Sequence, residues 1–315
     1  MRTLVADPLP SPARTRDTDR PPLVVGLVQT RWHEDADEHA AVLADGIAAA
    51  AAAGADMVFL PELTLLRYPA DTRPNGVAAE WAEPLQDGPT FRFAARCAAE
   101  SKVVVHASLY ERADGPDGRG YNTAILVAPD GRLLARTRKL HIPITTGYYE
   151  DQYFRPGPAV DPYPVVELSG PSAARVGLPT CWDEWFPEVA RAYSLAGAEV
   201  LAYPSAIGSE PDHPDFDTEP LWRQAIVGNA IANGLFMVVP NRWGDEGLIR
   251  FYGSSFICDP YGRILVRAPR SEDAALVASL DLAQRQDWLD LFPFLATRRP
   301  DTYGVLVEED RTGRA

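Results

Sequence analysis

The sequence is poor in cysteine and lacks long apolar runs. Its 315 residues include three cysteines, too few and too scattered for a disulfide framework or a CxxC metal site. We therefore expect a reducing, cytoplasmic setting. No run of about 18 uncharged apolar residues occurs, which argues against a membrane span. The five histidines form no HExxH or HxH pattern, and GxGxxG, P-loop and GxSxG motifs are absent, so neither a metal nor an organic cofactor is expected.

Positive charge is also in deficit. Lysine and arginine number 30 against 44 aspartates and glutamates, which gives a formal net charge of −14. This charge repels polyphosphates and anionic membranes at long range, so nucleic acid is a poor partner. Solubility alone is the simplest explanation of the acidity. As a substrate, a neutral or cationic small molecule fits better than an anionic one.

The two ends of the chain differ from its middle. Residues 1–22 mix arginines, aspartates and prolines and lack the apolar stretch of a secretory signal, so we predict a disordered leader. Residues 23–281 are expected to form one domain. Residues 282–315 are polar and punctuated by proline, which is typical of an arm that packs elsewhere or of a frayed tail.

Between the ends, strand-like and helix-like segments alternate. Helices are predicted over 38–53, 90–100, 188–196 and 218–232. Strands are predicted over 23–30, 57–60, 103–110, 123–129, 133–137, 200–204, 236–240, 254–258 and 264–267, and one more ends near Cys181. Hairpin turns are indicated at Asp130-Gly131 and at Asp259 to Gly262. The pattern predicts the α/β class, with mixed sheets covered by helices on their outer faces.

A cysteine follows one of the apolar strands. Cys181 is succeeded by an aromatic and acidic turn and then by a helix. At the carboxyl end of a strand, a side chain is presented outward and the next backbone N–H groups point toward a bound oxyanion. On its own, however, the pattern favours a buried cysteine that acts as a small hydrophobe.

Two further charged residues follow predicted strands. Glu62 comes directly after the strand at 57–60, where partial desolvation raises the pKa of a carboxyl group and suits it to proton transfer. Lys139 follows the strand at 133–137, where a fixed cation stabilises a tetrahedral intermediate. Each residue alone is explained equally by an ordinary surface charge.

Together these three segments resemble the nitrilase superfamily of carbon–nitrogen hydrolases. The Glu-Lys-Cys triad of that family has its match in Glu62, Lys139 and Cys181, in the same order and after strands of the same kind. The family's second glutamate is matched by Glu150 in Gly147-Tyr148-Tyr149-Glu150. The resemblance covers roughly residues 23–281 and implies a four-layer α-β-β-α sandwich with two mixed sheets and a homodimer or higher oligomer.

The resemblance also implies a role for each matched residue. Glu62 is the general base, Lys139 and the backbone N–H of Trp182 form the oxyanion hole, and Glu150 orients the substrate nitrogen and Lys139. Cys181 is the nucleophile, since its thiolate is the reactive form of the side chain. No metal or cofactor is needed.

Within the superfamily, the chain is most similar to N-carbamoylputrescine amidases, through the segments 139–143, 181–188 and 206–211. Those enzymes cleave a terminal ureido group. Glu210 is the expected partner of the distal ammonium of the substrate. Trp182, Trp185 and Phe186 are expected to line an alkyl chain that ends in a cation, although ordinary core packing explains the last two equally well.

Three residues depart from the pattern of that branch. Pro179 stands in the strand before the cysteine, where it would remove a ladder donor. Ile144 replaces a usual aspartate. Arg67 would carry a positive charge into the pocket unless it pairs with a carboxylate such as Glu210. The departures leave two alternatives open: an amidase acting on an ω-amino- or guanidino-alkylamide, and a catalytically silent binding protein.

Overall fold

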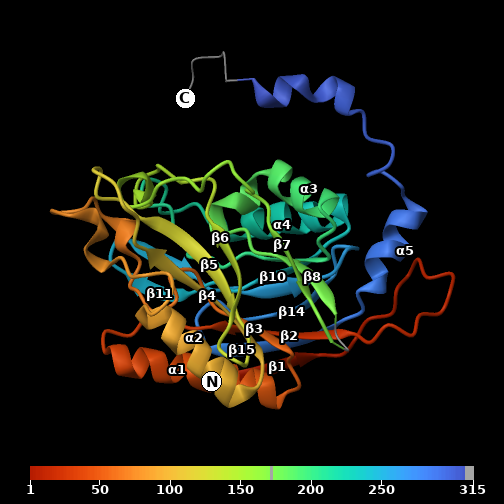
Figure 1. Ribbon diagram of the computed structural model, residues 1–315, viewed down its shortest axis with the longest axis horizontal. Helices are drawn as coiled ribbons and strands as arrows, with labels where there is room; N and C mark the ends of the chain where they lie inside the picture. Colours follow the sequence, from red (N-terminus) through yellow and green to blue (C-terminus); the bar gives the residue numbers. More distant parts are fainter. Residues whose placement is uncertain (171–172, 309–315) are drawn as a thin grey trace.

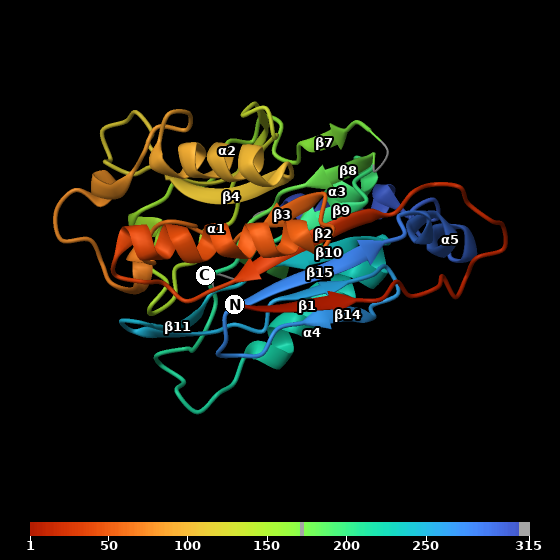
Figure 2. The same ribbon diagram turned by 90° about the horizontal axis from the view of Figure 1, so that it is seen from below.

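Two β-sheets lie face to face at the centre of the molecule (Figures 1 and 2). The computed structural model describes residues 1–170 and 173–308. The first, seven-stranded sheet has the order β1 (Arg2–Ala6), β15 (Ala274–Leu280), β2 (Leu23–Gln29), β3 (Met57–Phe59), β4 (Val104–Glu111), β5 (Tyr121–Val127) and β6 (Leu133–Arg138). The second, six-stranded sheet has the order β14 (Ile264–Arg267), β13 (Phe256–Cys258), β10 (Phe236–Val239), β9 (Val200–Ala202), β8 (Ala174–Gly177) and β7 (Val165–Leu168).

Both sheets are mixed and carry helices on their outer faces. In the first sheet, β2 and β3 are parallel whereas β4 and β5 are antiparallel. The second sheet combines a parallel β9–β10 pair with an antiparallel β10–β13 pair. The helices α1 (Ala36–Ala52) and α2 (Pro89–Ser101) pack on the first sheet, and α3 (Pro187–Leu195) and α4 (Glu219–Asn233) pack on the second. This arrangement confirms the predicted four-layer α-β-β-α sandwich.

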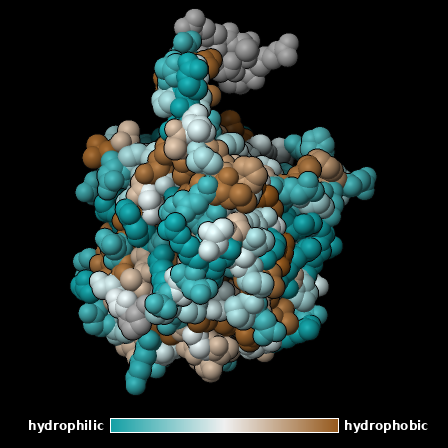
Figure 3. All heavy atoms as spheres, turned by 90° about the vertical axis from the view of Figure 1, so that its right-hand side faces the viewer, coloured by the Kyte–Doolittle hydropathy of each residue, from teal (hydrophilic) through white to brown (hydrophobic). Residues whose placement is uncertain are grey.

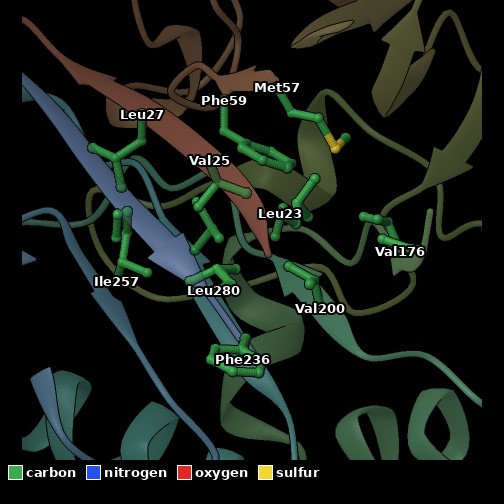
Figure 4. Close-up of a cluster of buried hydrophobic side chains, with 14 of the residues drawn as sticks. Leu23, Val25, Leu27, Met57, Phe59, Val176, Val200, Phe236, Ile257 and Leu280 are labelled. Carbon is green, nitrogen blue, oxygen red and sulfur yellow. The ribbon is translucent and has the colours of Figure 1, made fainter. Parts of the chain in front are cut away.

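An apolar core fills the space between the sheets. Leu27 and Phe59 contribute to it from the first sheet, and Val200, Phe236 and Ile257 contribute from the second. Figure 4 shows how these buried side chains lie between the strands that carry them. Each buried side chain of this size contributes about 1.5–3 kcal/mol. The stacked sheets therefore form a rigid support for the loops at the ends of their strands.

The predicted elements between residues 23 and 267 are all present, with ends that differ by a few residues. Local chemistry explains several of these ends. Asp35 caps α1 by accepting a hydrogen bond from the backbone N–H of Glu38 at 2.8 Å. Pro89 begins α2, and Gly234 ends α4 in the left-handed region at φ 62°. Both predicted hairpins are confirmed as the antiparallel pairs β5–β6 and β13–β14.

The N-terminal segment differs from the expected disordered leader. Residues 2–6 form β1, which pairs in parallel with β15 at the edge of the first sheet. The following segment crosses to α5 (Ala283–Leu291), where Arg14 forms ion pairs with Asp281 at 2.7 Å and Asp287 at 2.9 Å. The segment has few apolar residues, so composition predicts disorder. Distant carboxylates and an open sheet edge supply the partners that local composition does not reveal.

The remaining elements are short. A hairpin of β11 (Trp243–Glu246) and β12 (Ile249–Tyr252) stands beside the second sheet. Five 3₁₀ segments are described: η1 (Pro69–Asp71), η2 (Ala78–Trp81), η3 (Glu150–Gln152), η4 (Cys181–Trp185) and η5 (Pro300–Val307). Among the described residues, no helix combines the length and apolarity that crossing a membrane requires.

The C-terminal segment leaves the body of the molecule after α5. This helix is attached to α4, because Trp288 donates its indole N–H to the carbonyl of Ile231 at 2.9 Å. Beyond it the chain projects outward, as Figures 1 and 3 show, and Leu306 and Val307 are exposed there. The segment therefore has the form of an arm up to residue 308, where the described part of the chain ends.

Candidate active site

Glu62 lies beyond the carboxyl end of β3, in a loop that buries it completely. The next residue, Leu63, has a left-handed φ of 50°. Arg242 stabilises this conformation by donating to the carbonyls of Glu62 at 2.7 Å and Leu63 at 3.1 Å. Arg242 follows β10 of the second sheet and pairs with Glu246 at 2.7 Å. A residue that follows a strand of one sheet thus fixes the Glu62 loop, which follows a strand of the other.

Two buried carboxylates share one buried ammonium group. The Nζ of Lys139 lies 2.9 Å from the Oε1 of Glu62 and 2.7 Å from the Oε2 of Glu150. Asn122 donates to the same Oε1 of Glu62 at 2.7 Å, and the hydroxyl of Tyr68 donates to the Oε1 of Glu150 at 2.9 Å. The Oε2 of Glu62 is buried and has no hydrogen-bond partner among the described residues. This oxygen is free to accept a proton.

The burial of this cluster sets its protonation. Burial lowers the pKa of Lys139, but the charges of Glu150 and Glu62 oppose that effect and hold the pKa well above its ordinary value. Burial raises the pKa of Glu150 to about 7, although the charge of Lys139 opposes the shift. Burial also raises the pKa of Cys181, and the charge of Glu62 adds to the rise. The thiol is therefore neutral at rest and needs a base to become a nucleophile.

Cys181 begins the turn η4 with strained backbone geometry. Its φ is 39°, a value that costs a residue other than glycine about 1–3 kcal/mol. Its backbone N–H donates to the carbonyl of Pro204, beyond β9, at 3.0 Å. Trp182 is the second residue of the turn, and amides in a first helical turn have no acceptor within it. Its N–H is therefore an available donor, and its expected role in an oxyanion hole stays a prediction.

The proline beside the nucleophile does not disturb the sheet. Strand β8 ends at Gly177, two residues before Pro179, so the proline occupies no ladder position. The expected loss of a ladder donor is therefore wrong. The extended segment from Pro179 to Cys181 is buried, and it joins the sheet to the turn.

Asp183 connects the nucleophile turn to the lysine segment. Its carboxylate accepts from the backbone N–H of Thr180 at 3.1 Å. The same carboxylate accepts from the backbone N–H of His141 at 3.0 Å, and it lies 2.7 Å from the Nδ1 of that residue. Lys139 is two residues before His141. A single buried carboxylate thus sets the spacing between the segment of Lys139 and the turn of Cys181.

One residue of the predicted aromatic wall packs against another side chain of the protein. Phe186 stacks on the ring of His141, with ring centroids 3.7 Å apart and planes inclined by 14°. The ring of Trp182 lies 6.3 Å from that of Trp185, and the indole nitrogen of Trp185 is buried without a partner among the described residues. Phe186 has a clear packing role. A substrate contact for Trp182 or Trp185 stays a prediction.

Glu210 is half-buried and has no ion pair with any described residue. Burial raises the pKa of its carboxyl group, and the charge of His213 opposes the rise. Among the described residues, the side chain that donates to it is the hydroxyl of Thr218, at a long 3.5 Å. Burial raises the pKa of Tyr148, and the charges of Glu210 and Cys181 add to the rise. Tyr148 accepts a hydrogen bond from the backbone N–H of Gly208 at 3.0 Å. The phenol of Tyr148 is thus close to both Glu210 and Cys181.

A cavity of about 510 Å³ lies near Glu210, although neither Glu210 nor the cluster of Glu62, Lys139, Glu150 and Cys181 lines it. Ser209, which precedes Glu210 in the chain, forms part of the cavity wall. Thr218, whose hydroxyl contacts Glu210, also lines the cavity. The cavity is also lined by two arginines that are already paired: Arg250 with Asp245 at 2.8 Å, and Arg270 with Asp217 at 2.7 Å. The volume is in the range of small-molecule sites.

Arg67 has a different partner from the one expected. Its guanidinium donates to Asp71 at 2.7 and 3.0 Å and to the carbonyl of Glu246 at 2.7 Å, and it does not contact Glu210. The fork geometry of arginine matches a neighbouring aspartate one helical turn away. The charge of Arg67 is therefore neutralised locally. The side chain of Ile144 is exposed and makes no contribution to the cluster of Lys139.

Sequence reasoning missed several residues that hold the site together. Asn122 is a buried polar residue inside a mostly apolar strand, and Arg242 follows a buried strand as Glu62 does. Both patterns are readable signals, because buried polar residues require partners. Tyr68 gives no such signal. It lies in a loop, and its contact with Glu150 depends on the folded structure.

Comparison with known proteins adds independent information. The profile of the carbon–nitrogen hydrolase family matches residues 24–290. A citrullinase from Francisella tularensis is 35% identical over 290 residues, which cover 90% of this chain and 98% of the citrullinase. An N-carbamoylputrescine amidase from Arabidopsis thaliana is 35% identical over 300 residues, which cover 91% of this chain and 96% of the amidase. The structure of a carbon–nitrogen hydrolase from Helicobacter pylori G27 aligns with a TM-score of 0.79 at 30% identity and covers 91% of this chain and 99% of that one.

Replacement of Asp183 by alanine should loosen both segments that it connects. Loss of hydrogen bonds to a buried carboxylate should lower the free energy of unfolding by about 2–3 kcal/mol. Hydrogen–deuterium exchange should become faster in peptides that contain Lys139 and Cys181. The exposed Asp130→Ala variant is the control. Equal exchange in both variants would show that Asp183 does not couple the two segments.

Proposed function

The chain belongs to the carbon–nitrogen hydrolase family, and from this we propose that it hydrolyses the terminal ureido group of an N-carbamoyl amine of the N-carbamoylputrescine type. The products are the amine, carbon dioxide and ammonia. One observation carries the proposal most directly. Glu62 keeps a free buried carboxylate oxygen while its other oxygen is held by Lys139, and both charges act on the thiol of Cys181. This arrangement combines a base, a cation and a nucleophile in one enclosed place.

The first chemical step forms a covalent intermediate. Glu62 accepts the proton of the thiol, and the sulfur of Cys181 attacks the carbonyl carbon of the substrate. The negative charge that develops on the carbonyl oxygen is stabilised by Lys139 and by the backbone N–H of Trp182. The tetrahedral intermediate then expels a nitrogen leaving group, which takes the proton back from Glu62. A carbamoyl thioester remains on the sulfur.

The second step returns the enzyme to its starting state. Glu62 accepts a proton from water, and the resulting hydroxide adds to the carbonyl carbon of the thioester. Collapse of this intermediate breaks the carbon–sulfur bond and returns the proton to the thiolate. The released carbamic acid loses carbon dioxide. Glu150 holds Lys139 in place at 2.7 Å and orients the substrate nitrogen.

Charges around the cavity support a cationic substrate. Glu210 has no described ion-pair partner, so the distal ammonium of a diamine derivative gives it one. A citrulline-like substrate, suggested by the citrullinase relative, also needs a cation for its carboxylate. Arg67, Arg250 and Arg270 are each already paired with an aspartate. The ureido-alkylamine is therefore the favoured substrate class.

Ammonia release from a panel of substrates tests this proposal. The panel holds N-carbamoylputrescine, citrulline, N-carbamoyl-β-alanine and an ω-aminoalkylamide, with Cys181→Ala as the blank. We expect turnover of N-carbamoylputrescine to exceed that of the other three. Preference for citrulline or the amide would retain the catalytic residues but overturn the substrate class. Turnover that persists in Cys181→Ala would exclude the proposed nucleophile.

The same panel tests the role of Glu210. Glu210→Gln should raise the KM for N-carbamoylputrescine about 10- to 100-fold, because a charged hydrogen bond to the substrate is lost. The value of kcat should change little. N-butylurea has the same chain length but no ammonium, so its kinetics should be unaffected. Asp212→Asn, at an exposed neighbouring carboxylate, is the matched control. Equal effects on both substrates would contradict ammonium recognition by Glu210.

We also propose self-association through the layer of α3 and α4. This layer leaves Leu195, Leu221 and Ile231 exposed, by 49%, 49% and 37%. Burial of such side chains between two copies removes apolar surface from water. Light scattering should give at least twice the mass of the chain. Ile231→Glu should lower that mass, whereas Leu248→Glu, on the β11–β12 hairpin, should not. A monomeric wild-type protein would contradict the proposal.

A further inference from the structure

Glu184 is a buried carboxyl group that the proposed mechanism does not use. It is the third residue after Cys181, within η4, and its side chain is fully buried. No lysine, arginine or histidine forms an ion pair with it among the described residues. The titratable groups that face it are Glu62, Lys139 and Cys181, together with the phenols of Tyr203 and Tyr252. A charge here would be both unpaired and close to the thiol.

The hydrogen bonds around Glu184 can be counted. Its Oε1 accepts from the indole N–H of Trp222 at 2.6 Å. Its Oε2 lies 3.3 Å from the hydroxyl of Ser205, and the same hydroxyl lies 3.0 Å from the carbonyl oxygen of Tyr203. A serine hydroxyl has one hydrogen to donate. A carbonyl oxygen can only accept, so the shorter contact uses that hydrogen. With that hydrogen on the Tyr203 carbonyl, a hydrogen bond between Ser205 and Glu184 takes its hydrogen from the carboxyl group; with that hydrogen on Glu184, the carboxyl group only accepts.

We propose that Glu184 is a neutral carboxylic acid that positions the Cys181 turn, with its Oε2–H donating to the hydroxyl of Ser205 while its Oε1 accepts from Trp222. All five polar atoms in this chain of contacts are then satisfied. The backbone carbonyl of Glu184 also accepts from Asn229 at 2.9 Å. Since Trp222 and Asn229 both belong to α4, the acid attaches the turn of the nucleophile to a helix of the outer layer.

Neutrality matters for the chemistry of the thiol. Burial holds the pKa of Glu184 well above its usual range, in agreement with the hydrogen count. Glu62 and Glu150 already surround the single ammonium of Lys139, so the cluster carries an excess negative charge. Another carboxylate beside Cys181 would oppose formation of the thiolate. A protonated acid gives the turn the same hydrogen bonds without this penalty.

The inference predicts that glutamine can replace Glu184. The amide oxygen of glutamine accepts from Trp222, and its NH₂ group donates to Ser205, which reproduces the pattern of the protonated acid. An ionised glutamate has no such equivalent, because both of its oxygens only accept. Alanine removes the attachment altogether. Comparison of these variants therefore separates the charge of residue 184 from its hydrogen bonds.

The test measures the rate at which iodoacetamide alkylates Cys181 as a function of pH. Wild type, Glu184→Gln and Glu184→Ala are compared, with Cys181→Ala as the blank for the other two cysteines and exposed Glu188→Gln as the control. Circular dichroism and thermal melting verify the fold of each variant. This reaction requires no substrate, so its result is independent of the proposed ureido specificity.

We expect the apparent pKa of alkylation in Glu184→Gln to match wild type within about 0.3 units, because no charge has been removed. Glu184→Ala, where it folds, should react about tenfold or more slowly through misplacement of the thiol. A fall of the apparent pKa of alkylation by about one unit or more in Glu184→Gln would show that a negative charge was removed, which overturns the proposal. Loss of reactivity in a folded Glu184→Gln would overturn it as well.

Discussion

The ammonium group of Lys139, held between the carboxylates of Glu62 and Glu150, is the interaction on which the site depends. All three side chains are buried, so none of these charges is stable without the others. Removal of one partner from a buried pair costs about 3–5 kcal/mol, because an uncompensated charge remains. The contact also orients Glu62, since its Oε1 is occupied and only its Oε2 can act as the base. The attraction that stabilises the cluster therefore also selects the reactive atom.

The two sheets supply different parts of this chemistry. Glu62 and Lys139 follow strands of the first sheet, whereas Cys181 follows a strand of the second. Two buried residues join the halves: Arg242 extends from the second sheet to the Glu62 loop, and Asp183 extends from the nucleophile turn to the Lys139 segment. The apolar core between the sheets holds the two sheets at a fixed separation. A sandwich with polar connections at one end is therefore a suitable support for a charged, water-excluded site.

Residues that directly follow buried strands were the most predictable part of the site. Glu62, Lys139 and Glu150 are brought together as the sequence and its family resemblance indicated. Contacts between distant segments were not predictable. Strand β1 pairs with a strand some 270 residues later, and no local pattern encodes that pairing. Arg67 pairs with a carboxylate, which the sequence left open, but this carboxylate is the nearby Asp71 and not the more distant Glu210. Pro179 was placed in a strand that in fact ends two residues earlier.

One measurement tests the central claim that the oriented Glu62 activates Cys181. The rate of alkylation of Cys181 by iodoacetamide at neutral pH is compared between wild type and Glu62→Gln, with Cys181→Ala as the blank. A glutamine keeps the size of the side chain but cannot accept the proton of the thiol. The account predicts a rate about 100-fold lower in Glu62→Gln, because loss of the proton acceptor outweighs the lower thiol pKa that removal of the Glu62 charge causes. Equal rates would contradict it, because the thiol would then owe its reactivity to another group.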